Sequence, residues 1–305
     1  MQANSDRAVD QPSGAVRLDD WGVIRVRGAD AAAFLHGQLT QDMATLGPGQ
    51  ARLAGYCSAK GRLQATFVAW RGGPDDGDIL LACSADLLAD TVKRLSMFVL
   101  RAKAALADAS ADWPLHGVTG PAVPDMPAWT TRHEGERTWV RLADVDGVAR
   151  ALCAGAPPAD LLALGLARWR GLEARSGIAR ITAATREQFV PQMVNMDLTG
   201  GLNFGKGCYP GQEVVARSQY RGTVKRRGFV VSSAAPLQPG QEVFDADAPG
   251  DPAGMVVLAG EADQGHVAFI ELKLAAAGHR LTAGSADGPA LQVSDLPYPL
   301  PVEAA

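Results

Sequence analysis

The segment KGCYPGQE, residues 206–213, places a single cysteine between a lysine-glycine pair and a tyrosine, then continues into Pro-Gly-Gln-Glu. The glycine before Cys208 lets the backbone turn sharply, and the Pro-Gly pair after it is a strong turn signal. The nearby ammonium group of Lys206 favours the thiolate form of a thiol held close to it. The eight residues alone leave two interpretations open, a reactive thiol or a buried structural cysteine in a glycine-rich loop.

The length and composition of the whole chain indicate a globular protein of several domains. With 305 residues the chain exceeds one typical core, so we expect two or three domains. Hydrophobic residues make up 47% and charged residues 20%, as in ordinary soluble proteins. The net charge of -4 argues against a protein that coats nucleic acid, although it allows a local basic patch.

The N-terminal segment and the cysteines predict where the protein resides. Residues 1–14 are polar, carry both charge signs and lack the apolar core of a signal peptide, so we predict a disordered tail. No apolar run has the length that a bilayer-spanning helix needs. The four cysteines form no C-x-x-C pair, which excludes a recognisable zinc or disulfide framework and fits a reducing compartment. We therefore expect a cytoplasmic protein with no membrane partner and no metal site.

Apolar periodicity in the first third of the chain predicts a mixed order of strands and helices. WGVIRVRG (21–28), LQATFVAW (63–70) and DILLAC (78–83) have strand patterns. Asp30 and Ser84 are placed to begin helices, because short polar side chains before an apolar periodic run are typical N-caps. This order suggests an α+β sandwich in which helices cover one face of a sheet.

The middle of the chain changes texture more than once. Residues 113–128 are rich in Pro and Gly and predict a connection, whereas RTWVRLADV (137–145) predicts a strand and residues 160–175 a helix. The following residues, 181–222, are dense in polar residues and glycine, which is typical of a segment that either lines a site or is disordered. Embedded apolar residues such as Phe189 argue against disorder.

Short apolar runs separated by turn residues begin at VKRRGFVVSS (224–233) and continue to the C-terminus. Several strands at such spacing predict a small barrel or sandwich. We therefore place a domain boundary near Thr223. The predicted division is a tail over residues 1–14, an α+β region over 15–222 and a β-barrel over 223–305.

The cysteine segment also carries a family resemblance. KGCYPGQEVVAR (206–217) matches K-G-C-[FY]-x-G-Q-E-x-x-x-R, the hallmark motif of the YgfZ family of folate-binding proteins, which are relatives of the glycine-cleavage aminomethyltransferase GcvT. Four further segments look like their family counterparts in order and spacing. They are LDDWGVIRVRGADAAAFLHGQLTQDM (18–43), YCSAKGRL (56–63), RLSMFVLRAKAAL (94–106) and QFVPQMVNMDLTGGLNFGKGCY (188–209). The resemblance runs from about Arg17 to the C-terminal barrel and is weakest between Trp113 and Leu162.

The resemblance implies a three-lobed, cloverleaf-like α+β fold, with two interleaved α+β lobes and a C-terminal β-barrel. It further implies a central funnel that binds tetrahydrofolate or a one-carbon derivative. The family is implicated in assembly or repair of iron–sulfur clusters in particular enzymes, and through one such enzyme in tRNA thiomethylation. The expected partners are therefore reduced folate and iron–sulfur client enzymes or assembly factors, without direct binding of nucleic acid.

A reduced folate needs an aromatic or apolar wall, paired donors and acceptors at the pterin edge, and cations for its glutamate tail. Trp21 and Phe189 lie where members of the family carry folate-contacting aromatic residues. Gln192 and Asn195 are amides that can donate and accept at the pterin edge, and Lys206 and Arg221 are the freer cations for the glutamate tail. Tyr209 of the motif completes the predicted folate-binding residues. The family more often has tryptophan where this chain has Phe189, which keeps a stacking face but lacks the indole donor.

Each of these assignments has a structural alternative. Trp21 could be a core residue at the start of a strand, and the two amides could stabilise turns. Six basic residues between positions 206 and 227 face a single acid, which suits a polyanion but also a solvated surface. They are Lys206, Arg217, Arg221, Lys225, Arg226 and Arg227.

Cys208 is the predicted reactive residue. A flanking lysine, nearby arginines and a helix that starts near Gln212 would all lower the pKa of its thiol. A stable iron–sulfur cluster normally takes four protein ligands, so one thiolate suggests a transient redox group or ligand. Glu213 and Arg217, four residues apart, are predicted to pair along the helix. The remaining motif residues are predicted to be structural, namely Gly207, Gly211, Gln212, Glu213 and Arg217.

One absence separates the functional hypotheses. Aminomethyltransferases of this kind place a carboxylate near the folate nitrogen in a G-x-x-D-D segment, whereas GRLQATF (61–67) has Gln64 and Ala65 there. An amide cannot replace a carboxylate as a base. The leading hypothesis is therefore a folate-binding accessory protein for iron–sulfur enzymes. The alternatives are a folate-dependent one-carbon transferase or demethylase, and a scaffold that binds no ligand.

Overall fold

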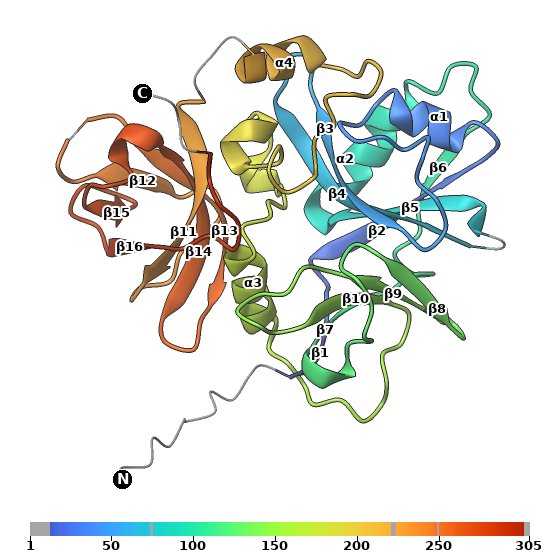
Figure 1. Ribbon diagram of the computed structural model, residues 1–305, viewed down its shortest axis with the longest axis horizontal. Coiled ribbons are helices and arrows are strands. Elements are labelled where there is room, and N and C mark those ends of the chain that lie inside the picture. Colours follow the sequence, from blue (N-terminus) through green and yellow to red (C-terminus); the bar gives the residue numbers. More distant parts are fainter. Residues whose placement is uncertain (1–12, 74–75, 221–223, 249, 302–305) are drawn as a thin grey trace.

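Three sheet-containing lobes surround helix α3 (Leu166–Arg175) in the computed structural model, with the C-terminal barrel on one side of this helix and the other two lobes on the opposite side (Figure 1). The structure describes residues 13–301 apart from 74–75, 221–223 and 249. None of the helices within these ranges is long and apolar enough to cross a membrane.

The first lobe is a five-stranded antiparallel sheet with the strand order β3-β4-β5-β2-β6. Its strands are β2 (Trp21–Arg27), β3 (Ala51–Cys57), β4 (Leu63–Gly72), β5 (Asp78–Ser84) and β6 (Ala105–Asp108). Helices α1 (Ala31–His36) and α2 (Ala85–Ser96) begin directly after Asp30 and Ser84, as predicted. Neither side chain caps its own helix, however, because Asp30 accepts from the Lys103 amide and Ser84 from Arg180.

The two faces of this sheet enter different cores, because side chains alternate along each strand. On β4, Phe67 and Ala69 pack into the core that α1 and α2 cover, whereas Val68 and Trp70 point into the core shared with the second lobe. The α+β sandwich with helices on one face is thereby confirmed. Both faces of the sheet are buried, which explains the nearly continuous apolar run at 63–70.

The second lobe is a five-stranded sheet whose strands come from both sides of the first lobe in sequence. Its strand order is β1-β7-β10-β9-β8. The strands are β1 (Gly14–Arg17), β7 (Leu115–Thr119), β8 (Thr131–Glu134), β9 (Arg137–Arg141) and β10 (Arg150–Ala154), with a 3-10 turn η2 (Gly120–Ala122). The described chain therefore contributes β1 to this lobe, builds the first lobe with β2 to β6, and then returns with β7 to β10. This order confirms the interleaved arrangement.

Two sequence-based predictions in the second lobe are wrong. Residues 113–128 are not only a connection, because β7 lies inside them and pairs with both β1 and β10. The helix predicted over 160–175 begins only at Leu166, since the residues before it are extended and bond to β1. Ala15 donates to the Leu162 carbonyl and accepts from the Leu164 amide, each at 2.9 Å.

The segment after α3 returns to the first lobe and is ordered, as its embedded apolar residues predicted. It contains the 3-10 turns η3 (Ala183–Thr185) and η4 (Pro191–Val194) and the helix α4 (Gln212–Tyr220). The Leu63 amide donates to the Phe189 carbonyl at 2.8 Å, and the Glu187 amide donates to the Leu63 carbonyl at 2.8 Å. These bonds fix the segment beside the start of β4.

The C-terminal part is a closed antiparallel barrel with the strand order β11-β14-β13-β12-β15-β16. The strands are β11 (Arg226–Ser233), β12 (Glu242–Asp245), β13 (Gly254–Glu261), β14 (His266–Lys273), β15 (Leu281–Ala283) and β16 (Ala290–Ser294), with a 3-10 turn η5 (Leu274–Ala276). Its interior is apolar and includes Val231, Val256 and Ile270. Of the two predicted architectures, the barrel is therefore the one observed. Thr223 lies outside the described residues, so the exact domain boundary stays a prediction.

The barrel and the lobes are joined by backbone groups in direct contact. A Cβ added to Gly171 of α3 would lie 1.8 Å from the Glu261 carbonyl oxygen, and one added to Gly260 would lie 2.1 Å from the Gly171 nitrogen. Asn195 makes a second junction, because its amide group donates to the Gly228 carbonyl at 2.9 Å and accepts from the Gly228 amide at 3.0 Å. Side chains larger than hydrogen have no space where α3 crosses β13.

We expect Gly171→Ala to lower the free energy of unfolding by about 2 kcal/mol or more, since a new methyl group meets a backbone carbonyl that cannot rotate away. Urea unfolding followed by circular dichroism measures this loss. Gly165→Ala is the matched control, because Gly165 precedes the same helix with nothing within 4 Å of its added Cβ. Its expected change is less than about 1 kcal/mol. Equal effects of the two substitutions would contradict the proposed backbone contact.

Candidate functional site

A cavity lies between the two sheets at the centre of the lobes. Its volume is about 50 Å³, far below the roughly 300–1,000 Å³ of small-molecule sites, so a ligand larger than a few water molecules would need the lining side chains to move apart. The first lobe contributes Trp21 and Phe67, and the second contributes Trp129 and Arg150. The cavity therefore has aromatic side chains on walls from both lobes, and Trp21 lies where the sequence predicted a ligand-contacting aromatic.

A buried ionic network forms the polar wall of this cavity. Arg180, 6% exposed, donates two bonds to the Glu173 carboxylate, both 3.1 Å long. It also donates to an Asp20 carboxylate oxygen at 3.0 Å and to the Ser84 hydroxyl at 3.1 Å. Its guanidinium lies 4.8 Å from the centre of the Trp21 ring, within the range of a cation–π contact. The wall thus holds a cation between two carboxylates beside an aromatic face.

The local fold explains how Glu173 and Arg180 meet. Glu173 lies on the last turn of α3, and Gly177 reverses the chain directly after it with a φ of 63°. This reversal returns Arg180 to the same wall. Burial raises the pKa of Glu173, and the charge of Arg180 opposes this shift.

One polar atom of the cavity lining, the indole nitrogen of Trp21, has no hydrogen-bond partner among the described residues. One carboxylate oxygen of Asp20, which bonds to the cavity-lining Arg180, also lacks a partner there. Both amide atoms of the buried Gln64 are unpaired within the described chain as well, at an irregularity in the β3–β4 pairing, but Gln64 does not line the cavity. Leaving such a group unpaired costs about 1–3 kcal/mol, so each calls for a partner such as water or a ligand.

The structure does not place Phe189 on the same cavity as Trp21. Phe189 is 2% exposed and lines a separate pocket between the first lobe and the barrel, together with Met193 and the ion-paired Arg226 and Glu271. The folate contact assigned to Phe189 stays a prediction. A ligand that touched both aromatic residues would have to extend from one cavity to the other.

The amides of Gln192 and Asn195 support the backbone in the structure. The side-chain nitrogen of Gln192 donates to the Val215 carbonyl of α4 at 2.7 Å. The side-chain oxygen, Oε1, has no partner among the residues described. Asn195 adopts a left-handed conformation with a φ of 60° and bonds to Gly228, as noted above. These contacts match the structural alternative, and the predicted pterin contacts stay predictions.

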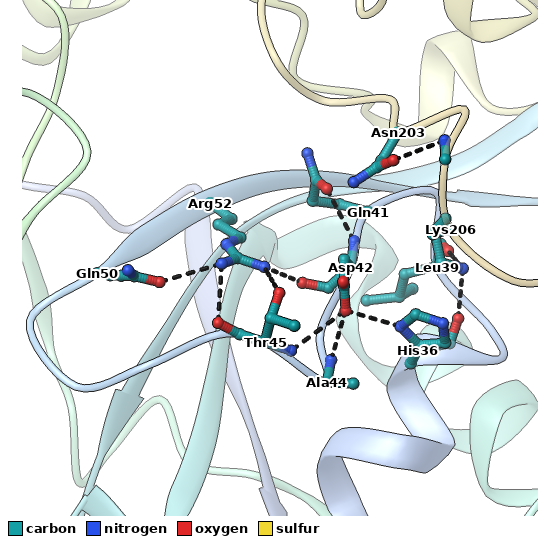
Figure 2. A network of polar contacts seen from close by, with 11 residues as sticks. His36, Leu39, Gln41, Asp42, Ala44, Thr45, Gln50, Arg52, Asn203 and Lys206 are labelled. Carbon is teal, nitrogen blue, oxygen red and sulfur yellow. Dashed lines mark hydrogen bonds and ion pairs between the residues drawn. The ribbon is translucent and has the colours of Figure 1, made fainter.

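The loop that carries the cysteine motif is held by its lysine. The Lys206 ammonium donates to the backbone carbonyls of His36 and Leu39, the latter at 2.9 Å (Figure 2). It also lies 4.8 Å from the centre of the Tyr209 ring. Desolvation lowers its pKa to about 8, although the negative charges of Asp42 and Cys208 oppose the shift. Lys206 is thus a buried anchor rather than the free cation that the sequence suggested.

Most of the other predicted motif residues lie on helix α4 or in the turn directly before it. Helix α4 starts at Gln212, as predicted, and Glu213 pairs with Arg217 at 2.9 Å on its exposed face. Such surface pairs contribute only about 0.3–0.5 kcal/mol. Gly211, with a φ of 79°, packs its backbone against Gly61. Arg221 lies outside the described residues.

Cys208 is the accessible thiol of the described chain. Its side chain is exposed, whereas the other three cysteines are buried. Burial raises the pKa of Cys57 and Cys83 to about 12 and that of Cys153 to about 11, which keeps these thiols protonated at neutral pH. The exposed side chain of Cys208 contradicts the interpretation of a buried structural cysteine, whereas the reactivity of its thiol stays a prediction.

Sequence analysis did not predict two pairs of residues that the structure brings together, Glu173 with Arg180 and His36 with Asp42. The first pair forms because the chain reverses at Gly177, which the spacing of the two residues does not encode. In the second pair, His36 lies 2.8 Å from a carboxylate oxygen of Asp42. Turn residues separate these two, so no regular pattern in the sequence connects them.

The overall architecture is that of a known class of protein. The structure is similar to the crystal structure of glycine cleavage system aminomethyltransferase T from Bartonella henselae, with a TM-score of 0.68 at 18% sequence identity. The similarity covers 93% of this chain and 86% of that one. The chain therefore has the fold of the aminomethyltransferases, as the resemblance implied. No protein-family model matches it.

Curated relatives give the family. The chain is 33% identical over 248 residues to the tRNA-modifying protein YgfZ of Edwardsiella ictaluri (strain 93-146), which covers 75% of this chain and 73% of that protein. It is 31% identical over 258 residues to the tRNA-modifying protein YgfZ of Klebsiella pneumoniae (strain 342), covering 75% and 76%. The chain belongs to the YgfZ family.

We expect Arg180→Met to lower the free energy of unfolding by about 3–5 kcal/mol, because it leaves Glu173 as a buried carboxyl group without its cation. Arg186→Met is the matched control, since Arg186 forms an ion pair of 2.8 Å with Asp90 at the surface. That substitution should cost less than about 1 kcal/mol. Chemical denaturation measures both, and a loss below 1 kcal/mol for Arg180→Met would show that the network does not stabilise the centre.

Proposed function

We propose that this protein is a tetrahydrofolate-binding accessory factor for iron–sulfur enzymes, which supports tRNA modification indirectly through such a client and acts through Cys208. An unpaired buried polar atom of the central cavity carries the proposal. The indole nitrogen of Trp21, which lines the cavity, has no partner among the described residues, and a molecule with a polar edge would satisfy it. The family relatives named as tRNA-modifying proteins support the tRNA part.

The side chains around the cavity supply the groups that a reduced pterin needs, although the cavity walls would have to move apart to admit the ring. The edge of a pterin carries adjacent N–H donors and a carbonyl acceptor on a flat ring, so it needs a carboxylate or amide together with an aromatic wall. Glu173 offers a carboxylate, Trp21 an indole donor and a ring face, and Trp129 an aromatic group on the opposite lobe. When bound, a reduced folate supplies nitrogen atoms that carry one-carbon units.

The residues around Gln64 favour binding over aminomethyl transfer. Gln64 and Ala65 are buried in β4 and bring no carboxylate to this position. The Asp42 carboxylate bonds to His36 and does not line the cavity. Glu173 accepts two bonds from Arg180, which oppose its use as a base. The one-carbon transferase therefore stays the second hypothesis, with no contact in its favour.

The exposed thiol supports an action on a partner outside the fold. Cys208 lies at the surface, so a cluster or a client enzyme could reach it without rearrangement of the core. One thiolate supplies at most one of the four ligands that a cluster normally takes. Cys208 would therefore serve as a transient ligand or redox group, with the partner providing the rest.

Titration with tetrahydrofolate tests the cavity. Binding should quench tryptophan fluorescence, and Trp21→Ala and Glu173→Gln should each weaken it at least about tenfold, or about 1.4 kcal/mol. Trp113→Ala is the control, because Trp113 contacts Arg25 outside the cavity and its loss should leave the affinity unchanged. If calorimetry detects no binding to the wild-type chain, the ligand-free scaffold becomes the better hypothesis.

Cys208→Ala tests the thiol separately from the cavity. The variant should bind tetrahydrofolate with wild-type affinity but reduce support of a cluster-dependent tRNA-thiomethylating enzyme at least about tenfold, since no other exposed thiol replaces it. Mass spectrometry of modified tRNA nucleosides from complemented cells measures the effect. Cys153→Ala keeps the exposed thiol and should retain full support. An active Cys208→Ala variant would defeat the proposed role.

A further inference from the structure

A histidine–aspartate pair lies beside the loop that carries Cys208. Helix α1 ends at His36, whose Nδ1 lies 2.8 Å from Oδ1 of Asp42. The same oxygen accepts from the amides of Ala44 at 2.9 Å and Thr45 at 3.2 Å. Arg52 donates to the Asp42 backbone carbonyl and thereby holds the turn from outside (Figure 2). The backbone bonds therefore hold the Asp42 carboxylate in position independently of its contact with the imidazole.

The bonds at Asp42 determine which nitrogen of His36 carries a proton. Desolvation acts to raise the pKa of Asp42, but the hydrogen bonds from Thr45 and His36 outweigh it, and the net pKa is lowered. The carboxylate is therefore ionised at neutral pH and accepts a proton from Nδ1. Nε2 is then left with a free lone pair, which makes it the proton acceptor of the ring.

Nε2 of His36 faces the cysteine loop. A Cβ added to Gly207, the residue before Cys208, would lie 3.3 Å from this nitrogen. No hydrogen bond to Nε2 occurs within the described part of the chain. The thiol of Cys208 is exposed and likewise has no hydrogen-bond partner among those residues, so rotation about its Cα–Cβ bond breaks no bond.

Lys206 joins the pair to the loop. Its ammonium bonds to the carbonyl oxygens of His36 and Leu39, so the end of α1 and the cysteine loop form one unit. The negative charge of Asp42 also acts on this ammonium. The charged groups in contact with His36 are Asp42, through Nδ1, and Lys206, through the His36 backbone carbonyl. Cys208 is the next residue after Gly207, whose added Cβ would lie 3.3 Å from Nε2.

We propose that His36, positioned by Asp42, accepts the proton of the Cys208 thiol, so that Cys208 reacts as the thiolate of a thiolate–imidazolium pair. The S–H bond breaks, the electron pair stays on Sγ, and the proton bonds to Nε2, while the Nδ1 proton remains donated to Asp42. The order of nucleophile, base and orienting carboxylate is that of activated cysteines in general, whose hydrogen bonds often tighten only on ligand binding. The inference deepens the proposed role of Cys208 but needs neither folate nor a client.

The rate of alkylation by iodoacetamide, followed on the full chain by intact mass between pH 6 and pH 10, tests this proposal. The buried thiols of the other cysteines keep the signal specific to Cys208. His36→Gln keeps a hydrogen-bonding side chain that cannot take up a proton. It should react at least about tenfold more slowly than wild type at pH 7 and equally fast at pH 10, where solvent deprotonates the thiol. Asp42→Asn should show a smaller loss at pH 7.

His279→Gln is the matched control, because His279 pairs with Asp245 at 2.7 Å in the barrel, and that aspartate also accepts two backbone amides. Its profile should coincide with that of wild type. Coincident wild-type and His36→Gln profiles would overturn the proposal. A uniform slowing of His36→Gln at every pH would overturn it as well, since it would show altered access instead of lost proton transfer. If Cys208→Ala proves active with a client while the profiles differ as expected, only the proposed function fails.

Discussion

The buried guanidinium of Arg180 is the interaction on which the centre of the molecule depends. It joins Asp20 before β2, Ser84 before α2 and Glu173 on α3, three segments that are distant in sequence. A charge removed from water is tolerated only where opposite charges and hydrogen bonds surround it, so these segments have one compatible arrangement. The position of the Trp21 ring, and hence the shape of the cavity, follows from that arrangement.

The parts of the fold that were predicted from sequence are those set by local patterns. Strands β2, β4 and β5 and the starts of both early helices follow from alternation and from polar residues before an apolar run. The barrel strands are short apolar runs between turn residues, so the sequence predicted this region equally well. Strand β7 was not, because its Pro- and Gly-rich surroundings resemble a loop and its partners β1 and β10 lie far away in sequence. The extended residues before α3 were misjudged for the same reason.

The residues of the candidate sites also divide into those that a short stretch of sequence predicts and those that only the tertiary fold brings together. The motif predicted Cys208 as the residue of interest, and it is exposed. The resemblance did the same for Trp21, which lines the cavity between the sheets. Both assignments depend on a short stretch of chain. The pairing of Glu173 with Arg180 and of His36 with Asp42 depends on where turns return the chain, which spacing does not encode. For Lys206 the sequence suggested more exposure to solvent than the structure shows. A lysine in a basic run suggests a solvated cation, yet two backbone carbonyls hold its ammonium away from water.

The contact of α3 with β13 has a mechanical consequence. Gly171, which touches the barrel backbone, and Glu173, which forms part of the cavity wall, lie within one turn of the same rigid helix. Any tilt of the barrel must therefore displace the carboxylate, and any molecule that grips the carboxylate must restrain the barrel.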